Sequence, residues 1–233
     1  MDEDDFRAFL KQRKKPENTI NSYINRTKKF EEFLASRSPP KGLNDATRED
    51  IEEFAFEWGK EQGINVYLYL WGIQSYYLYT KDLNLHNIAN EMKEWVQLEK
   101  YKLKDFEGVN KEYIKTLGSV GIRTALQLLE KGRTPIERKK LAKKSGIPID
   151  YILELVKLSN LARIGGLKKK RARLFYDAGF DTLDKIAAKD IDNLMNDIDD
   201  FIKKTGFSGR GVSISEANHT ISMAKFLQRL IEY

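Results

Sequence analysis

The chain has 233 residues, of which 41 are Lys or Arg and 35 are Asp or Glu, with a formal net charge of +6 and no cysteine. The lack of cysteine excludes a disulfide framework, a zinc ribbon, an iron–sulfur site and a thiol nucleophile. Two histidines, His86 and His219, are too few for a histidine-rich metal site, so we expect no metal and no cofactor.

Length and hydropathy place the chain in a broad class. At about 150 residues per domain, the length predicts one or two domains. The longest apolar run, Val66–Trp71, is far shorter than the roughly 20 residues of a membrane-spanning helix. The first residues are acidic where a secretory signal is basic. We therefore expect a cytoplasmic protein without a membrane partner.

The first half of the chain shows helical spacing and helix start signals. Apolar residues recur three and four positions apart within 6–10 and within 20–34, and Pro16 stands at the start of the second of these helices. Thr47 and Asp50 have the spacing of a capping box that opens a third helix. These signals predict a helical N-terminal domain over residues 1–95.

Residues 64–79 are rich in aromatic and aliphatic side chains and are compatible with a buried strand or a buried helix. Because no strand-like run adjoins them, we predict a helix whose aromatic side chains lie in the core. A polar, charged helix over 85–103 follows. We expect its last part, 96–103, to be a helical linker to a second domain over 104–233.

The second half has sharper start signals. Thr134-Pro135-Ile136-Glu137 combines an N-cap, a first-turn proline and a capping-box glutamate, and Ser213 with Glu216 repeats the capping pattern before a helix expected to reach Leu230. Residues 206–211 are glycine-rich but lack the Gly-Lys-Ser/Thr ending of a P-loop, which favours a mobile surface loop. No segment alternates with period two, so the predicted fold class is all-α.

An internal repeat appears when residues 108–129 are set beside residues 166–187, at an offset of 58. Glycines and apolar positions keep register over the two copies, which predicts one supersecondary unit used twice. Each copy is expected to contain a glycine turn, a short helix, a second glycine turn and a Thr-capped helix. The matched pairs include Gly108 with Gly166, Gly121 with Gly179 and Thr124 with Thr182.

Positive charge is concentrated in the second half. Residues 131–173 contain 14 Lys and Arg against three acidic residues, and a smaller basic run lies at 11–29. Concentrated positive charge indicates a polyanionic partner, and nucleic acid is the commonest one. The alternative is that Lys and Arg only solvate helix faces.

The second copy of the repeat has two features that suit a phosphate. Gly165 and Gly166 let an anion approach the unpaired N–H groups at the start of the next helix. The run Lys168–Arg171 follows at a helix end where the dipole disfavours cations, which favours a bound anion over a solvated lysine face. The first copy has Glu107 and Glu112 beside its turn, and it either binds phosphate or has a purely architectural role.

Ile164, Gly165, Gly166 and Leu167, with Ala172 at the small packing position, resemble the hairpin of the helix-hairpin-helix motif. The family's second glycine is replaced by Lys168 here and by Asn110 in the first copy. With copies at about 106–131 and 164–189, the region 104–233 resembles a family of uncharacterised prokaryotic domains with tandem helix-hairpin-helix repeats. This resemblance implies a domain that grips the DNA backbone without reading sequence.

Residues 1–95 resemble the N-terminal SAM-like core-binding domain of tyrosine recombinases and phage-type integrases. The resemblance implies a bundle of four or five helices that clamps one side of DNA, and the family's catalysis requires a further domain with a His-x-x-Arg element. Neither His86 nor His219 is followed by arginine at that spacing, so we expect no recombinase activity and no catalytic residue. The matching features are Thr19-Ile20, Tyr23, Phe30 and Phe33-Leu34, then Leu43, Thr47, Asp50-Ile51 and Phe54.

Taken together, these features predict a non-enzymatic protein that binds DNA along the phosphate backbone with low sequence specificity. The alternative is a protein–protein adaptor in a DNA-processing complex without direct contact to nucleic acid. The predicted contacts are Gly165, Gly166, Leu167, Lys168, Lys169, Lys170, Arg171 and Arg163 in the second copy, Gly108, Asn110 and Lys111 in the first copy, and Lys14, Lys15, Arg26 and Lys29 in the N-terminal domain.

Overall fold

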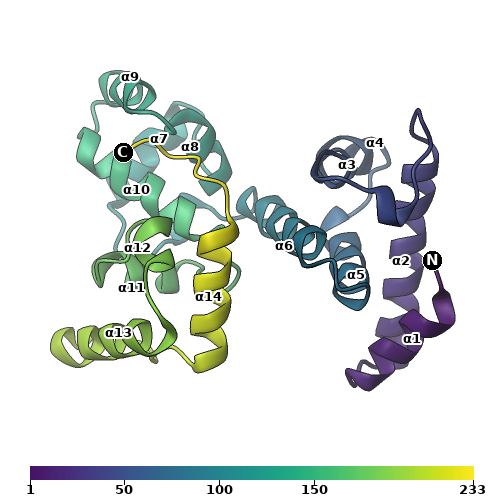
Figure 1. Cartoon of the computed structure of the whole chain (residues 1–233). Coiled ribbons are helices and arrows are strands. Elements are labelled where there is room, and N and C mark those ends of the chain that lie inside the picture. The colour runs from purple at the N-terminus through teal and green to yellow at the C-terminus, as the bar shows by residue number, and fades with distance from the viewer. The chain divides into compact units, whose positions relative to one another are not determined.

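The computed structural model describes residues 1–233 as helices joined by turns and loops, which confirms the all-α class (Figure 1). The only strand-like pairing is an isolated bridge between Lys102 and Thr124. None of the helices combines the length and the apolar character that crossing a bilayer requires. The chain divides into two compact units, Met1–Val96 and Gln97–Tyr233, and each is described separately.

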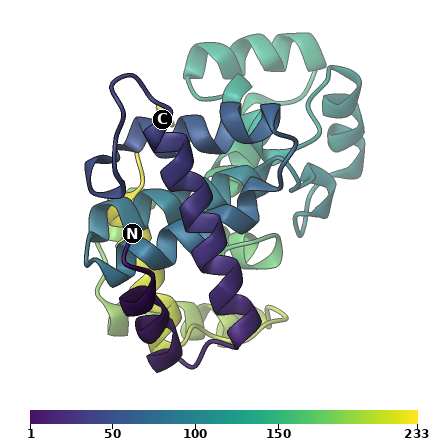
Figure 2. The same cartoon turned by 90° about the vertical axis from the view of Figure 1, so that its right-hand side faces the viewer.

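The N-terminal unit begins with two helices that pack side by side (Figures 1 and 2). Residues 64–79, for which a buried helix was predicted, contain helix α5, and its Tyr76 and Tyr77 lie in the core. The capping box predicted at Thr47 and Asp50 is present. The elements are α1 (Glu3–Gln12), α2 (Glu17–Ala35), η1 (Leu43–Asp45), α3 (Arg48–Glu53), the π-helical turn η2 (Phe54–Trp58), α4 (Gly59–Glu61), α5 (Val66–Tyr79) and α6 (Leu83–Leu98).

Helices α2 and α5 approach each other closely at Gly72. A Cβ atom at this position would lie 2.8 Å from the Tyr23 carbonyl oxygen and 3.2 Å from Cβ of Arg26, so only glycine fits against the neighbouring backbone. Around this contact the core buries Ile20, Ile24 and Ile73. The glycine therefore sets the distance between the two helices.

Gly72→Ala is expected to lower the free energy of unfolding by about 2 kcal/mol, because the added methyl group overpacks a backbone contact that cannot move as a side chain can. Urea denaturation followed by circular dichroism measures the change. The matched control is Gly118→Ala, because Gly118 is also helical and a Cβ atom there would meet no neighbouring atom closer than 4.0 Å. That substitution should stabilise the chain by about 0.5–1 kcal/mol, so destabilisation of equal size at both sites would contradict the packing argument.

The segment 96–103, expected to be a helical linker, is helical only as far as Leu98, where α6 ends. The helix ends at Leu98 because the backbone that follows is bonded to another part of the chain. The N–H of Leu103 donates to the Arg123 carbonyl and the N–H of Ala125 donates to the Tyr101 carbonyl, at 2.9 and 2.8 Å. These bonds hold the backbone against residues 123–125 in a form that is incompatible with a continuing helix.

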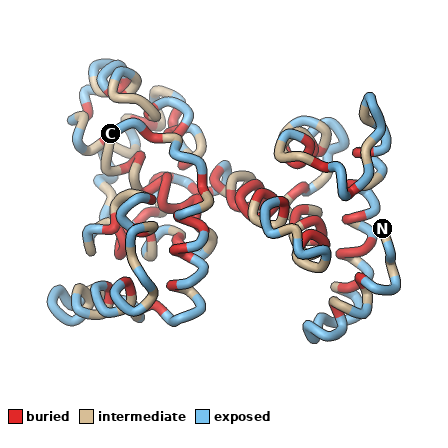
Figure 3. Tube along the Cα trace, in the orientation of Figure 1, coloured by how far each residue is buried: buried red, intermediate tan, exposed pale blue.

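The C-terminal unit is built around α10, which packs against α8, α9 and α11 and carries most of its residues in the core (Figure 3). The capping boxes predicted at Thr134 and Ser213 are both present. The elements are η3 (Leu103–Asp105), α7 (Lys111–Ser119), α8 (Ala125–Lys131), α9 (Pro135–Ser145), α10 (Ile149–Leu161), α11 (Lys170–Asp177), α12 (Leu183–Ala187), α13 (Ile191–Thr205) and α14 (Ile214–Phe226).

The last helix, α14, ends at Phe226 and not at Leu230 as expected. Leu227 is extended, with φ −61° and ψ 134°, and the chain then runs to its end without regular structure (Figure 1). Two buried arginines hold this segment, since Arg163 donates to the Gln228 carbonyl at 2.9 Å and Arg138 donates to the Glu232 carbonyl at 2.6 Å. Together with the bond from the N–H of Glu232 to the Arg133 carbonyl at 3.0 Å, they fix the last residues in a non-helical form.

The offset of 58 residues relates elements of the same kind. Helices α7 and α8 correspond to α11 and α12, and the turn between the helices repeats the same hydrogen bond, from Ile122 N to Leu117 O at 2.9 Å and from Phe180 N to Phe175 O at 2.8 Å. The turn glycines, Gly121 and Gly179, have φ of 90° and 91°. The two copies are thus one local structure built twice.

Candidate nucleic-acid interface

The second copy's hairpin joins α10 to α11 through a turn with one exposed glycine. Gly166 has φ 95° and is open to solvent, whereas Leu167 is buried and its N–H donates to the Ile164 carbonyl at 3.0 Å. The residue with left-handed backbone is Lys169, with φ 44°, and not Lys168, which stands where the motif has its second glycine. The residue with positive φ therefore lies one position later in this hairpin than the second glycine of the helix-hairpin-helix motif.

Arg163 was predicted to contact DNA, and the structure contradicts this. The residue is 1% exposed and lies in the core of the C-terminal unit. Its guanidinium donates to Asn160 Oδ1 at 3.0 Å and to the Gln228 carbonyl at 2.9 Å. A fully buried guanidinium that is used for internal hydrogen bonds cannot reach a phosphate outside.

Arg171 and Lys170 at the start of α11 are engaged by the glycine-rich loop 206–211. Arg171 Nη1 donates to the Arg210 and Gly211 carbonyls at 2.7 and 3.3 Å, and burial lowers the pKa of Arg171. Lys170 Nζ lies 3.1 Å from Ser208 Oγ. The Arg171 guanidinium is thus used largely within the protein, and its predicted role as a DNA contact stays a prediction.

Acidic and aromatic side chains lie beside the lysines of the second hairpin, which the local sequence does not show. Lys169 Nζ lies 3.3 Å from a carboxylate oxygen of Asp105, and Lys168 Nζ lies 5.4 Å from the centre of the Tyr101 ring. The Glu216 carboxylate lines the same small cavity, of about 40 Å³, as the two hairpin glycines and Leu167. This carboxylate is itself paired with Arg210 at 2.6 Å and accepts from the N–H of Ser213 at 3.0 Å. Of the predicted residues here, Gly166, Lys169 and Lys170 remain exposed.

The first copy's hairpin uses its hydrogen-bonding groups internally. Asn110 Oδ1 accepts from the N–H groups of Glu112 and Tyr113, at 2.9 and 3.1 Å, and the N–H of Asn110 donates to the Tyr151 hydroxyl at 2.5 Å. Gly108, with φ 70°, lies against the Arg173 guanidinium. These internal bonds favour the architectural alternative for the first copy, and phosphate contact at Gly108 and Asn110, which are both exposed, stays a prediction.

The N-terminal residues predicted to contact DNA fall into two groups. Lys14 and Lys15 are exposed and form no ion pair. Arg26 donates to the Leu68 carbonyl at 3.2 Å, and Lys29 forms an ion pair with Glu32 at 2.7 Å. Of these four residues, Lys14 and Lys15 are therefore the two whose side chains have no hydrogen-bond or ion-pair partner within the protein.

The feature that sequence reasoning missed is a set of unpaired cations in the first copy and α9. Thirteen Lys and Arg lie between residues 100 and 144, and none of them forms an ion pair, although eleven are exposed. Lys111, predicted as a contact, is among them. The cations of the second copy's region are mostly paired with carboxylates: Lys157, Lys169, Arg171, Arg173, Lys185 and Lys189.

Seven of the unpaired cations line two adjacent grooves that meet at Gln127 of α8. The first, here called the Lys115 groove, has a volume of about 660 Å³ and no acidic residue in its lining. The second, the Lys140 groove, has a volume of about 600 Å³. The cations are Lys102, Lys104, Lys115 and Arg123 in the Lys115 groove and Lys131, Lys140 and Lys144 in the Lys140 groove.

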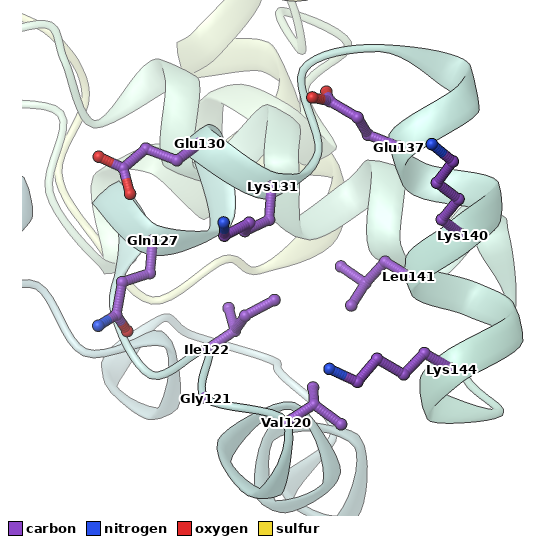
Figure 4. A pocket seen from close by; sticks show the side chains of 10 residues that line it. All are labelled: Val120, Gly121, Ile122, Gln127, Glu130, Lys131, Glu137, Lys140, Leu141 and Lys144. Carbon is purple, nitrogen blue, oxygen red and sulfur yellow. The ribbon is translucent and has the colours of Figure 1, made fainter.

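The Lys140 groove has an apolar floor and charged walls (Figure 4). Val120, Ile122 and Leu141 form the floor, while Lys140 and Lys144 project from α9 and Lys131 from α8. The acidic residues Glu130 and Glu137 also line it, but a carboxylate oxygen of Glu137 accepts from the N–H of Thr134 at 2.9 Å in the capping box. The lining of this groove therefore carries three lysines against two carboxylates, a net charge of +1.

In α9 the sequence itself indicates that the lysines lack ion pairs. Lys139, Lys143 and Lys144 have no Asp or Glu three or four positions away, so no ion pair can form along the helix. Helix α9 buries only Arg138 and Leu141, which leaves its lysines on the outside. These lysines belong to the basic range 131–173, but the glycine turn predicted a phosphate contact only at the other end of that range, at residues 165–171.

The part of the chain that contains the repeat matches a known family. No curated protein and no solved structure matches the chain. One family matches residues 107–227, a range that contains both copies of the repeat, the Lys140 groove and helix α14. The match covers more than half of the chain, which therefore belongs to the family described as "Domain of unknown function (DUF4332)".

Proposed function

We propose that the protein binds nucleic acid, DNA above all, along the phosphate backbone, and that it acts by binding and not by catalysis. The single observation that supports this most is the set of cations without internal partners. Their central part, called the basic surface below, consists of the seven groove cations Lys102, Lys104, Lys115, Arg123, Lys131, Lys140 and Lys144.

Unpaired cations on one surface create a positive potential that is lowered when a polyanion binds and releases its counterions. Six of the seven residues are lysines. A lysine ammonium group binds phosphate as a point charge, without the planar fork with which arginine reads a base edge. The proposed binding is therefore of low sequence specificity, and it involves the first copy and α9 more than the second hairpin.

Binding of duplex DNA is expected to weaken steeply with salt. If about six phosphates are neutralised, the logarithm of the association constant falls against the logarithm of the salt concentration with a slope near −5. Fluorescence anisotropy with a labelled duplex of mixed sequence, titrated at several sodium chloride concentrations, measures the slope. A second duplex of unrelated sequence should give the same slope and affinity. A slope near zero, or no binding at low salt, would overturn the proposal.

A second candidate follows from the floor of the Lys140 groove. Its apolar side chains and cationic walls also suit an acidic amphipathic peptide, and Ile136 at the start of α9 is 66% exposed. This is the adaptor alternative in a specific form. Absence of DNA binding at low salt, together with saturable binding of such a peptide that is lost in a Leu141→Gln variant, would favour it.

A further inference from the structure

The N-terminal unit contains a separate cavity of about 170 Å³ between α1, α5 and α6. Phe9, Leu10, Trp71 and Leu78 supply apolar walls, and no carboxylate lines it. A cavity of about 150 Å³ accommodates one benzene ring, so this one has room for a single six-membered ring. The space is too small for a larger ligand to enter entirely.

Two cations line this cavity as well, and the guanidinium of one of them, Arg13, lies 5.0 Å from the centre of the Phe9 ring. Arg13 and Lys15 belong to the short connection between α1 and α2, and neither forms an ion pair. Lys14 between them has a left-handed backbone, with φ 55°, and does not line the cavity.

His86 also lines this cavity, and its ring carries a hydrogen-bond acceptor. Its Nδ1 lies 2.9 Å from the Gln74 carbonyl oxygen. Because a carbonyl only accepts, Nδ1 carries the proton of the neutral ring, and Nε2 is left as an acceptor without a partner in the protein. Burial lowers the pKa of His86, the hydrogen bond to Gln74 opposes this shift, and the charges of Lys93 and Arg13 add to it. The net shift is downward, so the neutral ring predominates at pH 7.

We propose that this cavity binds a pyrimidine nucleotide, with the ring between the apolar walls and the phosphate group on Arg13 and Lys15. An N–H group of the ring would donate to Nε2 of His86. The ligand is either a free mononucleotide or an unpaired nucleotide within a strand, since the chemistry of the two is the same. The proposal does not depend on the basic surface, because the two sites share no residue.

The test uses the histidine signals of the full-length protein. The chain has only two histidines, so the imidazole region of an NMR spectrum reports His86 directly, with His219 as an internal reference. UMP is expected to shift the His86 signals saturably, with a dissociation constant of about 1 mM, and to leave His219 unchanged. Bound phosphate should also raise the pKa of His86 toward its usual value, because a nearby negative charge favours the protonated ring.

Three further ligands and one variant make the result specific. Uridine, which lacks the phosphate, should bind at least about fivefold more weakly than UMP, and inorganic phosphate should give no saturable shift. The double variant Arg13→Gln, Lys15→Gln should lose this preference for UMP over uridine, and its exposed positions leave the fold intact by circular dichroism. Oligo(dT) that shifts His86 where UMP does not identifies the ligand as part of a strand.

Two outcomes would overturn the proposal. One is the absence of any His86 shift with both UMP and oligo(dT) at about tenfold above the expected dissociation constant. The other is an equal shift with inorganic phosphate alone, which would show an anion site without recognition of the ring. Because the readout is a residue of the N-terminal unit, neither outcome affects the test of the basic surface.

Discussion

Replacing Lys140 and Lys144 with glutamine is expected to weaken the proposed binding of duplex DNA by about 60-fold at 0.1 M salt. Each phosphate contact that is lost removes about 0.9 from the slope against salt, which is a factor of about eight in affinity at this concentration. Both lysines are exposed, line the Lys140 groove and lack ion pairs, so their removal leaves no buried group without a partner. Anisotropy titrations at several salt concentrations should therefore show both weaker binding and a slope that is less steep by about two.

The matched control removes the same number of charges from the second hairpin. Lys169→Gln with Lys170→Gln is expected to weaken binding less than about threefold, because Lys169 lies beside Asp105 and Lys170 beside Ser208. The salt slope of this variant should equal that of the unchanged protein. If the control loses as much affinity as the groove variant, the hairpin is the main contact and the basic surface is wrongly placed.

Arg173→Met is expected to lower the free energy of unfolding by about 3 kcal/mol. The Arg173 side chain is 9% exposed and connects three elements. Its guanidinium donates to the Glu107 carbonyl at 2.9 Å, to Glu154 at 2.7 Å and to Asp177 at 3.3 Å. Methionine fills much of the volume but leaves these acceptors without a donor, and breaking an ion pair that is largely buried costs more than losing an exposed one.

The comparison variant is Arg210→Met. Arg210 also bonds a carboxylate, that of Glu216, but its side chain is 73% exposed, so the expected loss is below about 1 kcal/mol. Urea denaturation of both variants, followed by circular dichroism, gives the two values on one scale. A loss below about 1 kcal/mol for Arg173→Met as well would show that this arginine does not hold the first hairpin to α10 and α11.

Local features of the structure were predictable from the sequence. The capping boxes at Thr134 and Ser213 depend on residues three positions apart, and the helix over Val66–Tyr79 depends on the lack of a neighbouring strand. The repeat was visible because its turn glycines, Gly121 and Gly179, are needed for a positive φ that other residues adopt poorly. Such features follow from the chemistry of adjacent residues.

The end of α6 and the end of α14 were not predictable in this way. Both helices stop where the following backbone is bonded to distant parts of the chain, to residues 123–125 in the first case and to Arg163 and Arg138 in the second. The tendency of the local sequence to continue a helix was overridden by these long-range hydrogen bonds.

The sequence by itself determined that the chain is helical, that a unit is repeated and that positive charge is concentrated in the second half. Only the tertiary structure decided which of the cations are available to a partner. Arg163 and Arg171 lie close in sequence to exposed lysines, yet their partners are Gln228, Arg210 and Gly211, far along the chain. Whether a charged side chain is free depends on which acceptors the fold brings within hydrogen-bonding distance, and that information is not carried by neighbouring residues.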